Sequence, residues 1–351
     1  MALYLDNRVS DLYTFGQPVL LTIEMTKMIR VTLYVGLMFM GLVGCGQYTA
    51  YQYLNQSLIA QAQGDEDGAL AYLQAAVDEQ PHDAYLLRRL GWFYTQRKEY
   101  DAAFVSLQTA LQLEPAYLAV YQDLASVSEA QGNVAGVIGW LESAIATVPA
   151  YKDTYNDLAN IYLAQEQYHE AQALLEGAVA RWPDATWAYF RLGSLYVHLK
   201  VPQQAIDAFR KVVAFEPVND IEYALFVEAH SALGNIYYDQ ENYDLAIEFF
   251  KKAIELNPAD HSSMNNLAWV FATQGVHLEE GIVLSRRSLR LNPNSPTYLD
   301  TLAELYFAQG DVERAIQIIR QAIAQDPDQP ELRAHLRAQL ARFLASGQGK
   351  V

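Results

Sequence analysis

The side chains that could do acid–base, nucleophilic or metal chemistry are spread through this 351-residue chain without a recognisable grouping. The seven histidines follow no metal-ligand spacing. The chain also lacks a Gly-rich phosphate loop, a His-Glu-x-x-His helix and a Gly-x-Ser-x-Gly nucleophile turn. The acidic run Asp65, Glu66 and Asp67 has the composition of a turn between helices and is a weak candidate for a metal site. We therefore predict a noncatalytic protein that uses no cofactor and no metal.

Cys45 is the one residue whose surroundings point to a definite chemistry. It is the only cysteine, which excludes disulfides within the chain, and it follows the apolar run 31–43. That run is too short to cross a bilayer, which needs about 20 residues, but it has the length of the apolar part of a signal peptide. The residues Leu42-Val43-Gly44-Cys45 resemble the bacterial lipoprotein signal, the lipobox. The resemblance implies cleavage before Cys45 and lipid attachment to its sulfur.

This resemblance also implies a location. Residues 1–44 would be the signal peptide and residues 45–49 the lipidated N-terminus, which predicts a lipid-anchored protein of the bacterial cell envelope. Gly46, rather than an aspartate, follows the cysteine; by resemblance to enterobacterial sorting this favours the periplasmic side of the outer membrane in a Gram-negative cell. A translation start at Met25 or Met28 would give a signal peptide of ordinary length. The alternative is an uncleaved anchor that ends in this motif by chance.

A row of prolines sets the organisation of the remaining chain. Successive gaps are 34, 34, 34, 34, 41, 35 and 34 residues, between Pro81, Pro115, Pro149, Pro183, Pro217, Pro258, Pro293 and Pro327. A fixed period in this range predicts a stack of repeats, none of which can bury its apolar face alone.

Other residues follow the same period when each proline is counted as position 32 of a repeat and one extra residue, near residues 276–278, is allowed in repeat seven. Position 8 is small in all eight repeats: Ser57, Gly91, Ala125, Ala159, Gly193, Gly234, Ala268 and Ala303. Position 11 is aromatic in six: Tyr94, Tyr162, Tyr196, Tyr237, Phe271 and Tyr306. Positions 20 and 27 are mostly alanine. This spacing predicts two closely packed helices per repeat. Glycine recurs at position 15, where the chain must reverse through a left-handed conformation: Gly64, Gly132, Gly275 and Gly310.

The pattern resembles the tetratricopeptide repeat family, best in Leu192, Gly193, Tyr196, Ala205, Phe209 and Pro217. The resemblance implies an all-α, right-handed α-solenoid of about eight helix-turn-helix repeats over residues 50–329, followed by a capping helix and tail at 330–351. The expected repeats are 50–83, 84–117, 118–151, 152–185, 186–219, 220–260, 261–295 and 296–329. Repeat six carries seven extra residues, which predict either a longer first helix or a slack loop.

In this family the first helices line a concave groove that binds protein or peptide partners. The resemblance maps the groove here onto Tyr85, Arg88, Arg89, Trp92, Trp187, Phe190, Arg191, Asn235, Tyr238, Trp269 and Phe307. Large aromatics with arginine beside them are the usual anchors of such interfaces. The alternative is that some of these rings pack against the neighbouring repeat.

The charge is −17, and the acidic excess lies between residues 46 and 283. It argues against nucleic acid as a partner and against docking on anionic lipid. The excess carboxylates either keep the solenoid soluble or face a basic partner.

We predict a noncatalytic, lipid-anchored scaffold that binds protein partners during assembly of an envelope complex. The alternative is a glycan- or small-ligand-binding lipoprotein that uses the groove aromatics. The sequence leaves the oligomeric state open.

Overall fold

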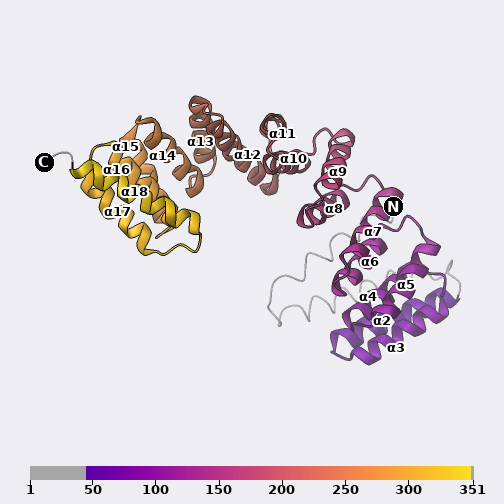
Figure 1. Cartoon of the computed structure of the whole chain (residues 1–351). Coiled ribbons are helices and arrows are strands. Elements are labelled where there is room, and N and C mark those ends of the chain that lie inside the picture. The colour runs from indigo at the N-terminus through magenta and orange to yellow at the C-terminus, as the bar shows by residue number, and fades with distance from the viewer. Residues whose placement is uncertain (1–44, 349–351) are drawn as a thin grey trace. The chain divides into compact units, whose positions relative to one another are not determined.

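The computed structural model describes residues 45–348, which form α-helices joined by short turns and contain no β-strand (Figure 1). The predicted signal peptide at 1–44 lies outside these residues. No helix in the described part is long and apolar enough to cross a membrane. The chain divides into an N-terminal segment that ends at Pro149 and a C-terminal segment that begins at Ala150.

The N-terminal segment contains three helix pairs. Its helices are α2 (Cys45–Ala62), α3 (Glu66–Glu79), α4 (Ala84–Gln96), α5 (Tyr100–Leu113), α6 (Leu118–Ala130) and α7 (Val134–Thr147). Each pair forms one repeat, and its first helix packs on its second. Helix α2 begins at Cys45, before the expected start of the first repeat at residue 50, so the residues predicted as a lipidated N-terminus are helical.

The C-terminal segment contains five pairs and one further helix. Its helices are α8 (Lys152–Ala164), α9 (Tyr168–Arg181), α10 (Thr186–His198), α11 (Pro202–Ala214), α12 (Asp220–Asp239), α13 (Tyr243–Leu256), α14 (His261–Gln274), α15 (Leu278–Leu291), α16 (Pro296–Ala308), α17 (Val312–Ala324) and α18 (Pro330–Gln348). The prediction of helix pairs with a final capping helix is confirmed. Helix α12 has 20 residues, so the extension in repeat six lengthens the helix and is not a slack loop.

Short polar side chains start many of these helices. Their oxygens accept hydrogen bonds from backbone N–H groups of the first turn that have no partner within the helix, as N-caps do. The capping residues are Asp65, Asp83, Asn133, Asn219, Asn242, Asp260, Ser295 and Asp311. This local chemistry fixes where the helices begin.

The turns within repeats use the left-handed conformation predicted for glycine. Gly64, Gly132, Gly275 and Gly310 all have positive φ, between 67° and 89°. Four other repeats adopt the same conformation at this position without glycine, with φ between 57° and 61°, at Lys98, Glu166, Lys200 and Glu241. The repeat geometry therefore requires this turn whether or not the residue favours it.

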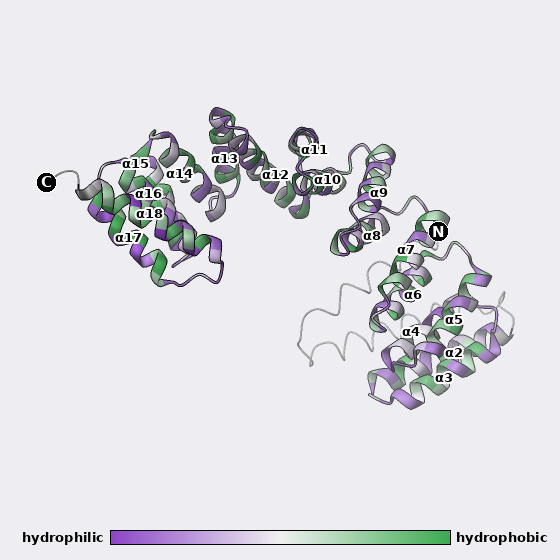
Figure 2. Cartoon of the chain, viewed as in Figure 1, coloured by the Kyte–Doolittle hydropathy of each residue, from purple (hydrophilic) through white to green (hydrophobic). Residues whose placement is uncertain are grey.

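The small residues at position 8 let the two helices of a repeat approach closely, as predicted. A Cβ atom on Gly193 would lie 2.8 Å from the ring of Phe209, and one on Gly234 would lie 2.7 Å from the ring of Phe250. Both phenylalanine side chains are fully buried. Hydrophobic and hydrophilic residues occur along every helix (Figure 2), and the hydrophobic ones fill these contacts.

Candidate partner-binding surface

Side-chain bonds connect the first helix of one repeat to the first helix of the next. Arg88 on α4 bonds to Asp123 on α6 at 2.6 Å, Arg191 on α10 bonds to Asn156 on α8 at 2.9 Å, and Trp269 on α14 bonds to Tyr238 on α12 at 2.8 Å. The residues predicted for the groove therefore lie along adjoining first helices within each segment. Tyr85 and Asn235 are exposed, and the other nine predicted residues are partly buried.

In the N-terminal segment the two predicted arginines differ. The Arg88 guanidinium pairs with Asp123 and also lies 5.6 Å from the ring centre of Tyr117. Burial raises the pKa of Asp123, although the neighbouring Arg88 charge opposes this shift. Arg89 forms no ion pair with a described residue; it lies 5.5 Å from the Trp92 ring, and its Nε is buried without a hydrogen-bond partner. Arg88 is therefore neutralised internally, and Arg89 is the better candidate for an anionic ligand group.

In the C-terminal segment α10 contributes Trp187, Phe190 and Arg191. Phe190 packs edge-on against Phe209, with ring centres 5.5 Å apart. Burial lowers the pKa of Arg191, and the nearby Asp157 carboxylate partly offsets this. Trp187 is partly buried and makes no hydrogen bond to a described residue. Its indole N–H is therefore an unused donor on α10.

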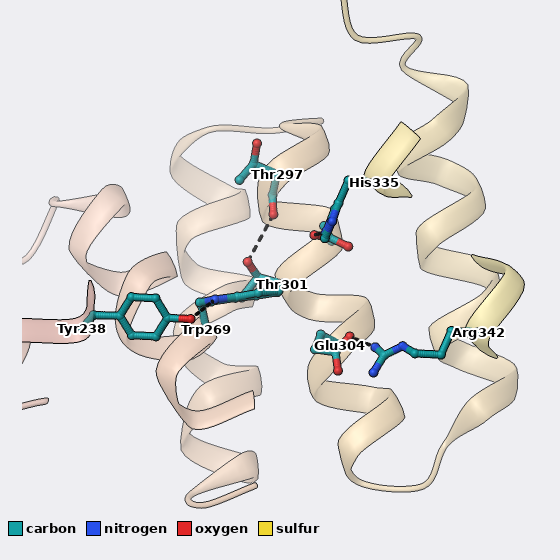
Figure 3. Close-up of polar contacts among 8 residues, drawn as sticks. Tyr238, Trp269, Thr297, Thr301, Glu304, His335 and Arg342 are labelled. Carbon is teal, nitrogen blue, oxygen red and sulfur yellow. Dashed lines mark hydrogen bonds and ion pairs between the residues drawn. The ribbon is translucent and has the colours of Figure 1, made fainter. Parts of the chain in front are cut away.

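Helices α12 and α14 hold a second pair of aromatic side chains in fixed positions. The Trp269 indole N–H donates to the Tyr238 hydroxyl at 2.8 Å (Figure 3), and the Tyr238 ring centre lies 5.8 Å from that of Tyr243. Beside them, the Asn266 amide donates to the Asn235 carbonyl oxygen at 2.9 Å. These bonds set the ring orientations, so a ligand that met them would not have to order them first.

Phe307 has different surroundings from the other predicted groove residues. Its ring stacks on Phe343 of α18 with centres 4.5 Å apart, and the Arg342 guanidinium lies 4.6 Å from its centre. The neighbouring carboxylates Asp300 and Glu304 are only 5% and 8% exposed. The Phe307 ring therefore packs against a neighbouring helix, which is the alternative that the sequence analysis gave for some of these rings.

The capping helix docks through these two carboxylates, a contact that the sequence analysis missed. The His335 ring nitrogen bonds to Asp300 at 2.8 Å, and Arg342 pairs with Glu304 (Figure 3). Burial raises the pKa of both Asp300 and Glu304, against the opposing effects of His335 and Arg342. Two acidic residues four apart on the last first helix, ahead of a helix rich in arginine, are the sequence signal that could have indicated this contact.

The acidic run at 65–67 has a structural role. Asp65 caps α3 by accepting from the backbone N–H of Gly68 at 2.9 Å, and Asp67 pairs with Arg97 at 2.7 Å. Across residues 45–348, no three His, Cys, Asp or Glu side chains are grouped so that they could hold a metal ion. Helix capping and an ion pair therefore account for Asp65 and Asp67.

The chain matches models of the tetratricopeptide repeat at residues 54–117, 156–220, 227–260 and 277–340. Over 119 residues it is 27% identical to the Small glutamine-rich tetratricopeptide repeat-containing protein 2 of Mycosarcoma maydis, covering 34% of each chain. Over 99 residues it is 31% identical to the TPR repeat-containing thioredoxin TTL4 of Arabidopsis thaliana, covering 28% of this chain and 14% of that protein. The chain thus matches only about a third or less of these curated relatives' length.

Solved structures with similar folds include YrrB, described as a TPR protein with an unusual peptide-binding site. It is 22% identical with a TM-score of 0.47, and the match covers 56% of this chain and 97% of YrrB. The pilF protein of Pseudomonas aeruginosa is 19% identical with a TM-score of 0.45, covering 63% of this chain and 97% of pilF.

Proposed function

Because the chain belongs to the tetratricopeptide repeat family, we propose that it is a noncatalytic scaffold that binds a protein or peptide segment along its first helices. The observation that carries the proposal is the set of partly exposed aromatics on α10, α12 and α14: Trp187, Phe190, Tyr238 and Trp269. A few aromatic side chains usually supply most of the binding energy of such an interface. Trp187 offers an unused indole N–H, and Trp269 is already oriented by Tyr238.

The proposed scaffold is attached to a bacterial envelope membrane through lipid on Cys45. The support is the lipobox-like sequence, since the side chain of Cys45 lies outside the described part of the structure. Helix α2 begins at this residue, so lipid attachment there would place the first repeat close to the bilayer without a linker. Two or three acyl chains would anchor it firmly, whereas one alone binds marginally.

A photo-crosslinking residue at position 187 tests the binding proposal. Val283 on the second helix α15 is the matched control, because it is apolar and 63% exposed. In cells, we expect crosslinks from position 187 to a protein, identified by mass spectrometry, and few from position 283. Glycan attached at position 187 would favour the alternative function, and equal labelling at both positions would refute a binding surface on the first helices.

The extension of α12 is the competing location for a partner. Its Ile221 side chain is 76% exposed, and the Tyr223 hydroxyl donates to the Leu256 carbonyl at 2.9 Å. We compare deletion of residues 220–226 with Trp187→Ala. If the deletion abolishes the crosslinked partner and Trp187→Ala does not, the partner binds the extension.

Labelled palmitate tests the anchor. Cys45→Ser should abolish incorporation of the label and release the protein from the membrane fraction, while an exposed substitution such as Ser346→Ala should change neither. Continued incorporation in Cys45→Ser would show that the lipobox interpretation is wrong.

A further inference from the structure

The second helices of the last four repeats carry a basic residue at position 25 of the repeat, and the first three of these helices carry another at position 26. We call these residues the basic stripe: Arg210 and Lys211 on α11, Lys251 and Lys252 on α13, Arg286 and Arg287 on α15, and Arg320 on α17. The first four repeats have no basic residue at these positions: Gln74 and Ala75, Gln108 and Thr109, Glu142 and Ser143, Glu176 and Gly177.

Position 25 contacts the aromatic residue at position 11 of the next repeat, which places equivalent residues in one row. The Arg210 guanidinium donates to the Tyr237 hydroxyl at 2.7 Å, and Arg286 donates to the Tyr306 hydroxyl. The Lys251 ammonium lies 5.7 Å from the ring centre of Phe271. All the helices involved belong to the C-terminal segment.

This contact does not require a positive charge. In the first repeat the neutral Gln74 amide donates to the Tyr94 hydroxyl at 2.8 Å. In the fourth repeat the acidic Glu176 accepts from the Tyr196 hydroxyl at 3.0 Å. Glutamine and glutamate thus serve the packing role of position 25, and packing alone does not explain four successive cations there.

The helix dipole does not account for the cations at position 25 either. Its favourable effect on cations is limited to about the last turn of a helix. Arg210, Lys251, Arg286 and Arg320 all precede the last turn of their helices. Only Lys211, at position 26, lies in a last turn.

These charges remain accessible to a partner. Arg210, Lys251, Arg286 and Arg320 are all exposed. A tyrosine hydroxyl leaves the guanidinium charges of Arg210 and Arg286 unneutralised. The Lys251–Glu280 pair at 3.4 Å is exposed on both sides and is therefore weak. Arg320 forms no ion pair with a described residue.

We infer that the basic stripe binds an extended acidic segment of a partner protein, on a surface separate from the first-helix aromatics. The stripe is narrow, and Asp207 and Glu248 lie one turn before Arg210 and Lys251 on the same helices. These carboxylates repel a broad anionic surface such as a phospholipid bilayer or a nucleic acid. An extended peptide can place its acidic side chains on the row of cations and avoid the carboxylates of Asp207 and Glu248.

The length of the segment follows from helix packing. Neighbouring helices pack about 8–10 Å apart, so equivalent positions on successive second helices are at most roughly 20 Å apart. An extended chain spans about 3.3 Å per residue, so about six residues connect one cation to the next. A segment of about 20 residues covers the stripe from Arg210 to Arg320.

The test uses the full chain purified in detergent and a fluorescein-labelled peptide of about 20 residues, alternating glutamate and serine, read by fluorescence anisotropy at low salt. The stripe variant is Arg210→Gln, Lys251→Gln, Arg286→Gln and Arg320→Gln. Glutamine keeps the contact that Gln74 makes with Tyr94. The control variant, Lys98→Gln, Arg181→Gln, Lys200→Gln and Arg337→Gln, removes the same charge from other exposed sites.

The wild-type chain should bind this peptide in a salt-sensitive manner. The stripe variant should bind roughly tenfold more weakly, since exposed ion pairs are individually weak and four act together. The control should stay within about twofold of wild type, and both variants should keep wild-type helicity by circular dichroism. Equal binding by the stripe variant, or an equal loss in the control, would overturn the inference. So would wild-type binding to phosphatidylglycerol vesicles in the absence of peptide binding.

Discussion

Helices α14 and α16 occupy equivalent places in successive repeats but treat the same position in opposite ways. On α14 it holds Trp269, which is partly exposed and oriented by Tyr238 on the preceding first helix. On α16 it holds Glu304, which is buried and paired with Arg342 on the following helix. A first-helix position is therefore available to a ligand only if the next first helix leaves it uncovered.

The largest expected effect is at position 8, which holds a small residue in every repeat. Gly234→Leu should destabilise the C-terminal segment by about 3 kcal/mol, because even a Cβ there would lie 2.7 Å from the Phe250 ring. Gly177→Leu is the matched control, since a Cβ at this exposed helical glycine meets nothing within 4 Å. Thermal unfolding measures both. An unchanged melting temperature in Gly234→Leu would contradict the close-approach role.

Arg342→Ala tests the ion pair that holds the buried Glu304 carboxylate. The substitution leaves Glu304 buried without its cation and should cost about 2 kcal/mol of stability in the α16–α18 contact. Arg337→Ala removes an exposed arginine from the same helix and should change stability by less than about 0.5 kcal/mol. Because repeats couple mainly to their neighbours, amide hydrogen exchange should locate the loss at α16 to α18. Uniform loss along the chain would argue against this assignment.

The exposed side is tested by Trp269→Phe, which keeps a ring but removes the N–H that donates to Tyr238. We expect a loss of about 1 kcal/mol in stability and weaker partner capture, with Thr273→Ala as a nearby control on α14. If capture is unaffected while stability falls, Trp269 has the same purely structural role as Glu304, and the contrast between the two helices disappears.

The stability contributed by the buried carboxylates of α16 should depend on pH, whereas that contributed by Trp269 on α14 should not. Burial raises the folded-state pKa of Asp300 and Glu304, so the folded state binds more protons than the unfolded state. Their contribution to stability is fully present below the unfolded pKa of about 4 and is lost as pH rises through the raised values. Wild type should therefore lose stability relative to Asp300→Asn with Glu304→Gln as pH rises from about 4 to 7.

Chemical unfolding of both proteins across this pH range measures the difference. Trp269→Phe changes no titratable group, so its stability should vary with pH in the same way as that of wild type. A wild-type stability that instead rises relative to the double variant would mean that His335 and Arg342 outweigh the burial of the two carboxylates.

The smallest expected effect is at the left-handed residue in the turn within each repeat. Lys98 has φ of 61°, and Glu166 has φ of 57°. Glycine adopts this conformation without steric cost, so Lys98→Gly and Glu166→Gly should stabilise by up to about 1 kcal/mol. Gly132→Ala should destabilise by a similar amount. Denaturant unfolding measures all three, and a loss of stability in both glycine variants would contradict the argument.

The repeats could be predicted from the amino-acid sequence alone. The prolines, the small residues at position 8 and the glycines of the turns act through steric contacts within one repeat, and local contacts are readable from spacing alone. The capping helix α18 was predictable for the same reason, whereas the longer helix α12 was one of two predicted alternatives that the structure decided. Left-handed turns at Lys98 and Glu241 were not, because the repeat imposes that conformation on residues that do not favour it.

Which of the predicted groove residues are free to bind depends on the tertiary structure. Arg88 and Phe307 have the right types and positions, but their availability depends on side chains more than 30 residues away: Asp123 for one, Phe343 and Arg342 for the other. The alignment of the basic stripe likewise depends on contacts between successive repeats, such as that of Arg210 with Tyr237. Periodicity fixes where a side chain starts, whereas its neighbours in space decide whether its charge or its ring is left for a partner.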